Sequence, residues 1–101
     1  MTTLTNEDLA LLRQAADLGV LKKQNRKRFA ITGTLSMPRN EMIRLITAVD
    51  GRFDSSVTPM TAYLICGRQA YDGRWTAKME AAHQLGVTVV AEDQFVELIK
   101  P

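Results

Sequence analysis

A chain of 101 residues with 46% hydrophobic and 24% charged residues has the length and composition of one globular domain. No apolar run approaches the roughly 18 residues that a membrane span needs, and residues 1–8 lack the basic start and apolar core of a signal peptide. The net charge of +2 identifies no class of partner, and the single cysteine, Cys66, excludes an internal disulfide framework, so we expect a reducing, intracellular setting.

The first predicted element is a helix over residues 5–19, and we assign residues 1–21 to this N-terminal unit. Thr5 is suited to cap the helix because Asp8 follows three residues later. Gly19 is suited to end it. The apolar residues that recur at helical spacing form a narrow stripe of Leu9, Leu12, Ala16 and Leu18.

A dense basic segment, residues 22–28, follows this helix and contains no acid. Its five cations are Lys22, Lys23, Arg26, Lys27 and Arg28. We predict a linker here, and two interpretations of its charge remain open. The cations are either a solvated connection or additional contacts to DNA phosphates beside a phosphate site.

The remaining residues, 29–101, form the main predicted domain, in which strands alternate with helices. Apolar, β-branched runs predict strands over residues 28–32, 52–54, 61–66 and 87–91. Apolar residues at helical spacing predict helices over residues 38–49, 74–85 and 92–99. This alternation is typical of an α/β fold. We therefore predict a three-layer domain in which helices flank a four-stranded parallel sheet, with an extra N-terminal helix.

Several of these segments resemble the BRCT domain family. They are Phe29–Ser36 with its Thr-Gly-Thr-Leu motif, the helix start Arg39–Glu41, Tyr63–Ile65 with Gly67, Lys78–Val87 and Glu92–Phe95. The resemblance covers roughly Lys27 to Lys100. It is closest to the BRCT domains of bacterial NAD-dependent DNA ligases and of the large subunit of the clamp loader, replication factor C. Two positions depart from the family: Phe95 stands where many members carry tryptophan, and Asp50-Gly51 replaces a glycine pair.

No catalytic centre is identifiable in the sequence. A ligase needs a lysine nucleophile in a Lys-x-Asp-Gly motif, and at the nearest match, Asp72-Gly73, Ala70 occupies the lysine position. One histidine, His83, and one cysteine, Cys66, are too few soft ligands for a metal site. We therefore expect a non-catalytic domain without cofactor or metal, with His83 on a helix surface and Cys66 packed as a small apolar residue.

Four residues form a candidate phosphate site. In a parallel α/β sheet, strand carboxyl ends and helix N-termini meet at one edge, where ligands usually bind. Thr32 and Gly33 end a strand at that edge, whereas Arg39 and Lys78 each lie near the start of a helix. A hydroxyl, a closely approaching glycine N–H, a guanidinium and an ammonium all suit an anion. The resemblance implies the same set, with the arginine joining the family's phosphate pocket to bind a 5′-phosphate of DNA.

A purely structural interpretation of these residues stays open. Thr32 and Gly33 would then form only a tight turn, and Lys78 would be an ordinary surface lysine. Lys78 shares a helix face with Ala82 and Leu85, which predicts that it points toward the sheet and counts against that interpretation.

A loop near the same edge offers further contacts. Arg68 and Arg74 flank this loop and are candidate DNA contacts. Tyr71 and Trp75 lie beside them in sequence, and an aromatic–basic cluster can stack on an exposed base. Trp75 is alternatively a partly buried anchor.

The leading functional hypothesis is a DNA-binding module that recognises a 5′-phosphorylated DNA end or nick and assists replication, repair or ligation. A second hypothesis is a protein-interaction module, including one that binds phosphopeptides. Phosphopeptide binding in the family usually needs two domains in tandem, which counts against that form. A third is a structural subunit of a ligase or polymerase complex with a vestigial pocket. The expected partners are DNA with a 5′-phosphate and a protein of the replication or repair machinery, and the oligomeric state stays open.

Overall fold

The computed structural model describes residues 5–67 and 76–101. Its first element is helix α1 (Asn6–Leu18), and the predicted N-terminal cap is present. Thr5 Oγ1 accepts a hydrogen bond from Asp8 N (3.1 Å), and Asp8 Oδ2 accepts one from Thr5 N (3.0 Å). Gly19 ends the helix in the left-handed conformation, with φ of +69°, as predicted.

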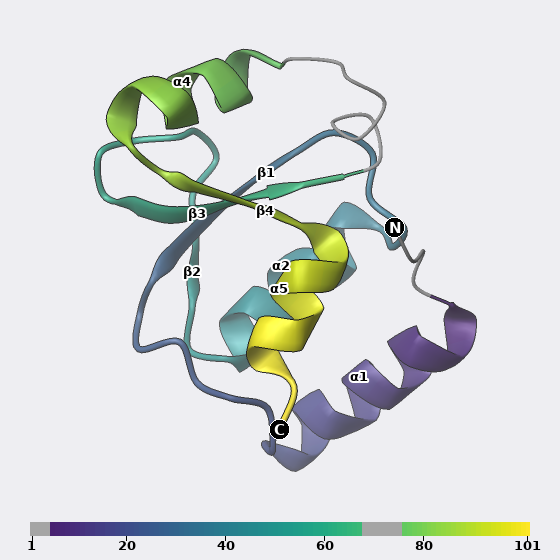
Figure 1. The fold of residues 1–101 in the computed structure, drawn as a ribbon. Helices are drawn as coiled ribbons and strands as arrows, with labels where there is room; N and C mark the ends of the chain where they lie inside the picture. The colour runs from purple at the N-terminus through teal and green to yellow at the C-terminus, as the bar shows by residue number, and fades with distance from the viewer. Residues whose placement is uncertain (1–4, 68–75) are drawn as a thin grey trace.

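A parallel four-stranded sheet forms the middle layer, as predicted. Its strands are β1 (Arg28–Thr32), β2 (Arg52–Phe53), β3 (Thr61–Cys66) and β4 (Thr88–Ala91), in the spatial order β2-β1-β3-β4 (Figure 1). The central strands β1 and β3 are apolar because both of their faces are covered. Thr32 pairs with Cys66 in register, so the carboxyl ends of the two central strands meet at one edge.

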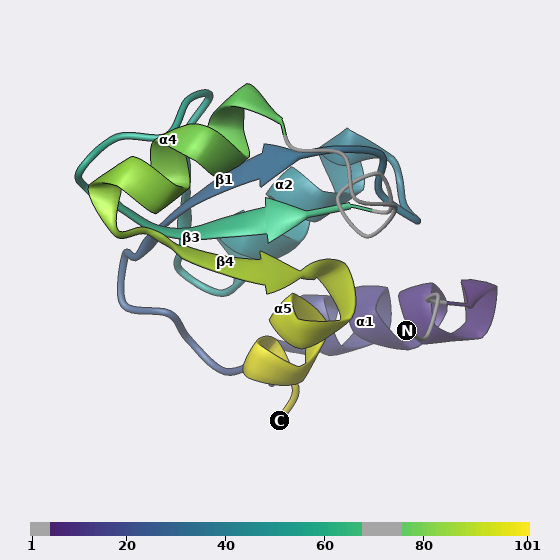
Figure 2. The same cartoon turned by 45° about the horizontal axis from the view of Figure 1, so that its top comes forward.

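Helices cover both faces of this sheet. Helices α2 (Arg39–Ala48) and α5 (Glu92–Ile99) pack on one face with α1 beyond them, and α4 (Ala77–Leu85) packs on the other (Figure 2). Side chains alternate along β1, so Phe29 and Ile31 enter the larger apolar cluster on the α2–α5 side. Ala30 enters the smaller cluster on the α4 side.

Some element boundaries differ from the prediction. Helix α4 begins at Ala77 and not at residue 74, because Thr76 is its N-cap and its Oγ1 accepts a hydrogen bond from Met79 N (3.2 Å). Helix α2 starts after Pro38 and ends at Ala48. Strands β2 and β4 are each one residue shorter than predicted.

Two leucines predicted to face the core are exposed. Leu18 is 68% exposed because six helical residues rotate it about 120° away from buried Leu12. Leu85, the last residue of α4, is 44% exposed, and the buried cluster on this face includes Ala82 but not Leu85. The predicted apolar face of α4 is therefore narrower than its sequence indicates.

The basic segment 22–28 is tied to the domain by backbone hydrogen bonds. Lys22 N donates to Ile99 O (2.8 Å) at the end of α5, and Arg26 N donates to Asp50 O (2.7 Å) just after α2. Gln24, between them, is 5% exposed. The segment predicted as a linker is thus a closely packed connection.

Candidate phosphate-binding site

Three elements bring the four predicted phosphate residues to one edge of the sheet. Thr32 is the last residue of β1, and Gly33 follows it. Arg39 is the first residue of α2, and Lys78 lies in the first turn of α4. Since helices run antiparallel to the strands they cover, both helix N-termini point to the carboxyl ends of the strands. The edge therefore combines two cations with two partly positive helix ends.

Lys78 and Arg39 converge on a single backbone oxygen. Lys78 Nζ donates to Ile31 O at 2.8 Å, and Arg39 Nη2 reaches the same oxygen at 3.5 Å. The pKa of Lys78 lies below its usual 10.5, first because burial disfavours the ammonium and second because the Arg39 charge repels it. Within residues 5–67 and 76–101, no carboxylate forms an ion pair with either cation. This pair of like charges suits an anion.

Two hydroxyls lie beside the cations. Thr32 Oγ1 donates a hydrogen bond to Thr76 Oγ1 (2.8 Å), and that same oxygen accepts the capping bond from Met79 N. With both lone pairs of its oxygen occupied, Thr76 keeps its own hydroxyl proton for another acceptor. Thr76 was not among the predicted site residues, because the helix was predicted to start at residue 74. A threonine directly before a helix is the cap signal that could have identified it.

Two glycines let the ends of β1 and β3 approach each other. Gly33 has φ of +81°, and a Cβ built on it would lie 3.3 Å from Gly67 N. A Cβ on Gly67 would lie 2.2 Å from Thr34 O, far inside van der Waals contact. Gly67 N also donates to Thr32 O at 2.8 Å. A side chain at position 67 would therefore clash more severely than one at position 33. The glycine at position 33 was predicted to be necessary, whereas the one at position 67 was not.

A buried carboxylate holds the loop between β1 and α2. Glu92 is 3% exposed, and its two oxygens accept from Ser36 N at 2.9 and 3.0 Å. This loop joins Gly33 to Arg39. The hydrogen bonds from Ser36 to Glu92, the first residue of α5, therefore hold the loop that forms one wall of the candidate site. Sequence analysis did not identify Glu92. An acidic residue directly after a strand and at the start of a helix is the sequence feature that could have identified Glu92.

The five cations of the basic segment lie at the opposite edge of the sheet, not beside the phosphate site. Arg28 starts β1 whereas Thr32 ends it, which separates the two edges by about 13 Å at about 3.3 Å per residue. Arg28 is paired with Asp54 (2.8 Å), and Lys23 Nζ donates to Ala48 O (3.2 Å). Lys27 lies over the Tyr63 ring at 5.7 Å from its centroid. Lys22 and Arg26 are exposed.

The loop candidates Arg68, Arg74, Tyr71 and Trp75 lie outside the described residues. Cys66 is 3% exposed, and burial raises the pKa of its thiol to about 11. His83 is exposed on α4. The described part of the chain contains no group of three or more His, Cys, Asp or Glu residues placed to hold a metal ion. It also contains no helix that is long and apolar enough to span a membrane.

Comparison with known proteins identifies the family. The family model described as BRCA1 C Terminus (BRCT) domain matches residues 22–99. The chain is 39% identical over 72 residues to a DNA ligase of Mycoplasmopsis agalactiae, a match that covers 71% of the chain and 10% of the ligase. A DNA ligase of Helicobacter hepaticus is 31% identical over 100 residues, 96% of the chain and 15% of the ligase. The chain thus spans only a small part of these relatives. A family model that covers most of the chain and a matching parallel α/β fold establish that the chain belongs to the BRCT domain family.

Proposed function

We propose that this chain is a non-catalytic module that binds a 5′-phosphorylated DNA end or nick and assists DNA replication, repair or ligation. The observation that carries the proposal is the convergence of Lys78 and Arg39 on Ile31 O. Burial and the charge of Arg39 both penalise the Lys78 ammonium, and a phosphate dianion held between the two cations offsets that penalty. Thr76, whose hydroxyl proton is unused, and the N–H of Gly33 supply neutral donors around the same anion, and Thr32 orients Thr76 by its hydrogen bond to Thr76 Oγ1.

Two features favour DNA over a phosphopeptide. Arg39 offers a planar fork that can grip two phosphate oxygens, and the resemblance to the ligase and clamp-loader domains assigns an arginine at this position to a 5′-phosphate of DNA. The basic segment at the other edge adds sequence-independent attraction to backbone phosphates, as a second contact on a duplex that starts at the phosphate site. Arg68 and Arg74 remain proposed contacts of the same kind. The relatives named as DNA ligases make an accessory role in ligation the natural setting.

The test compares a duplex carrying a recessed 5′-phosphate with its 5′-hydroxyl twin by fluorescence anisotropy at fixed salt. We expect the phosphorylated duplex to bind at least about tenfold more tightly, the equivalent of about 1.4 kcal/mol. Arg39→Gln should largely abolish that preference. Arg44→Gln is the matched control, because Arg44 is exposed on the same helix and no ion pair joins it to another described residue.

Equal affinities for the two duplexes would overturn recognition of the DNA end. A phosphoserine peptide serves as a competitor in the same assay. If the peptide displaces the duplex at lower concentration than a matched 5′-phosphorylated oligonucleotide does, the site belongs to a protein-interaction module and not to a DNA-end receptor.

A further inference from the structure

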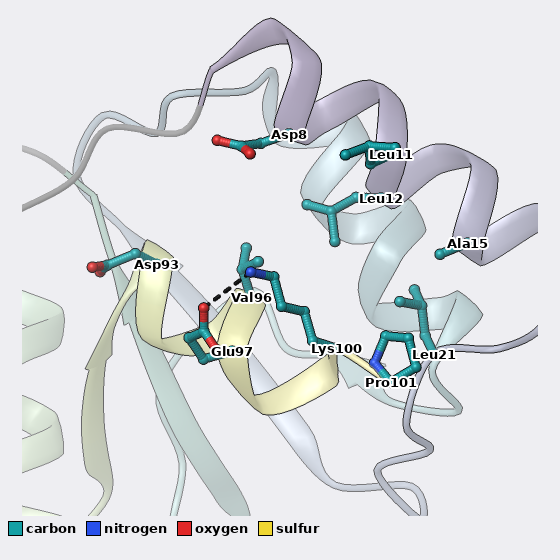
Figure 3. A pocket seen from close by; sticks show the side chains of 10 residues that line it. All are labelled: Asp8, Leu11, Leu12, Ala15, Leu21, Asp93, Val96, Glu97, Lys100 and Pro101. Atoms are coloured by element: carbon teal, nitrogen blue, oxygen red, sulfur yellow. Dashed lines mark hydrogen bonds and ion pairs between the residues drawn. The ribbon is translucent and has the colours of Figure 1, made fainter.

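A groove separates α1 from α5 on the side of the domain away from α4. Figure 3 shows Leu12 projecting from α1 toward Val96 of α5, with Leu11 beside it and Lys100, which follows α5, on the other side of the groove. The groove measures about 580 Å³, which lies within the range of about 300–1,000 Å³ typical of ligand pockets. Its floor is apolar, because Leu12 and Val96 are buried, and its rim includes Leu11, which is 58% exposed.

Acidic side chains surround this apolar floor. Asp8, Asp93 and Glu97 line the groove together with one cation, Lys100, which leaves an excess of two negative charges among the described residues that line it. Glu97 Oε1 already accepts from Lys100 Nζ at 3.1 Å, so the charge of Lys100 is paired with a carboxylate of α5. Asp93 Oδ1 is buried and has no hydrogen-bond partner among the described residues. Such an atom lacks the donor that a buried carboxylate oxygen normally has.

The groove is distinct from the phosphate site. Lys78 and Thr76 belong to α4 and its cap, on the opposite face of the sheet from α1 and α5. Arg39 begins α2 on the same face as α5, but it does not line the groove. The family model begins at residue 22, so α1, which forms one wall, lies outside the matched family core. An acidic rim also disfavours DNA, whose phosphates it would repel. The charge therefore selects a different type of partner from the one that the phosphate site selects.

We infer that this groove binds a short amphipathic helix of a protein partner, with apolar side chains one turn apart and lysine or arginine residues flanking them. An apolar stripe set into a groove between two helices is a common mode of peptide recognition. The partner's apolar side chains would cover Leu11 and Leu12, and its cations would face the carboxylates of half-buried Asp8 and exposed Glu97. Complementary charge at the rim then fixes the partner's orientation and excludes acidic helices.

The experiment uses the full chain and two labelled model peptides. One is a helical peptide with leucines at i, i+3, i+4 and i+7 and lysines elsewhere, and the other carries glutamate in place of each lysine. Fluorescence anisotropy at low salt should show the lysine peptide binding at least about tenfold more tightly than its twin. Leu11→Asn, which removes the apolar contact without adding a charge, should weaken that binding at least about tenfold, and a circular dichroism spectrum checks that the variant folds.

Leu18→Asn is the matched control, because Leu18 is 68% exposed on the same helix but does not line the groove. This variant should bind the lysine peptide as the unmodified chain does. Equal weakening by both substitutions would show non-specific attraction and overturn the inference, as would equal binding of the two peptides or no binding of either. None of these results depends on whether the phosphate site binds DNA.

Discussion

Replacing Lys78 with methionine should separate binding from folding. Methionine keeps the length and apolar stem of the side chain but removes the charge and the 2.8 Å hydrogen bond to Ile31 O. In the unbound protein that bond contributes about 1.5–3 kcal/mol, because its donor is an ammonium. Two effects oppose this loss. The repulsion between Lys78 and Arg39 disappears. Arg39 Nη2, which lies 3.5 Å from Ile31 O, is available to donate a hydrogen bond to that oxygen. We expect the free energy of unfolding to fall by less than about 2 kcal/mol.

Binding should change in a way that depends on the 5′-phosphate. A hydrogen bond between an ammonium and a phosphate is worth about 1.5–3 kcal/mol, so Lys78→Met should weaken binding to the phosphorylated duplex by roughly 10- to 150-fold. Binding to the hydroxyl duplex should change little, because that duplex places no terminal phosphate at Lys78. Denaturant unfolding measures the first quantity, and anisotropy with both duplexes measures the second.

The matched control for this variant is Lys22→Met, at an exposed lysine on the opposite edge of the sheet. That change should weaken binding to both duplexes by the same small factor. Our reasoning fails if Lys78→Met also weakens both duplexes equally, since Lys78 would then be a non-specific cation. A stability loss above about 2 kcal/mol with unchanged affinity would instead make Lys78 a structural residue.

Three other perturbations test the geometry. Gly67→Ala should destabilise the fold by more than about 2 kcal/mol, because its Cβ would lie 2.2 Å from a backbone oxygen; an unchanged melting temperature would refute the close approach. Three cations of the basic segment are replaced together by glutamine: Lys22, Lys23 and Arg26. If each contacts a phosphate, the slope of log affinity against log salt should flatten by up to about 2.7, at about 0.9 per contact, while the end preference stays. Affinity for the phosphorylated end should fall as pH rises through the Lys78 pKa, which is lowered from 10.5, because only the ammonium attracts phosphate. Lys78→Arg should move that fall to higher pH, since the guanidinium stays protonated, and an unshifted profile would assign the titration to another group.

The sheet and the edge that carries the site were predictable from local patterns. Alternation of apolar strands with amphipathic helices implies parallel strands, and parallel strands bring Thr32 and Lys78 to the same edge whatever the details of packing. The cap at Thr5 was predictable because the capping-box pattern lies within four residues.

What could not be predicted depends on contacts between distant segments. Position 67 requires glycine because the backbone of Thr34, which follows the end of β1, leaves no room for a Cβ there. The role of Glu92 arises from Ser36, which lies 56 residues away in the chain. The basic segment precedes β1, and its nearness to Thr32 in sequence suggested nearness to the site. The basic segment lies at the start of β1 and Thr32 lies at its end, so the extended strand separates them. Their spacing in the sequence alone does not show this separation.

Mapping backbone amide shifts during titration with the phosphorylated duplex tests the central claim most directly. Our account predicts that the largest shifts fall on Thr32, Gly33 and the first turn of α4, and that a hydroxyl duplex leaves these amides largely unmoved while still shifting those of the basic segment. Equal shifts at the strand-end amides with both duplexes, or shifts confined to the basic segment, would contradict recognition of a 5′-phosphate at this edge of the sheet.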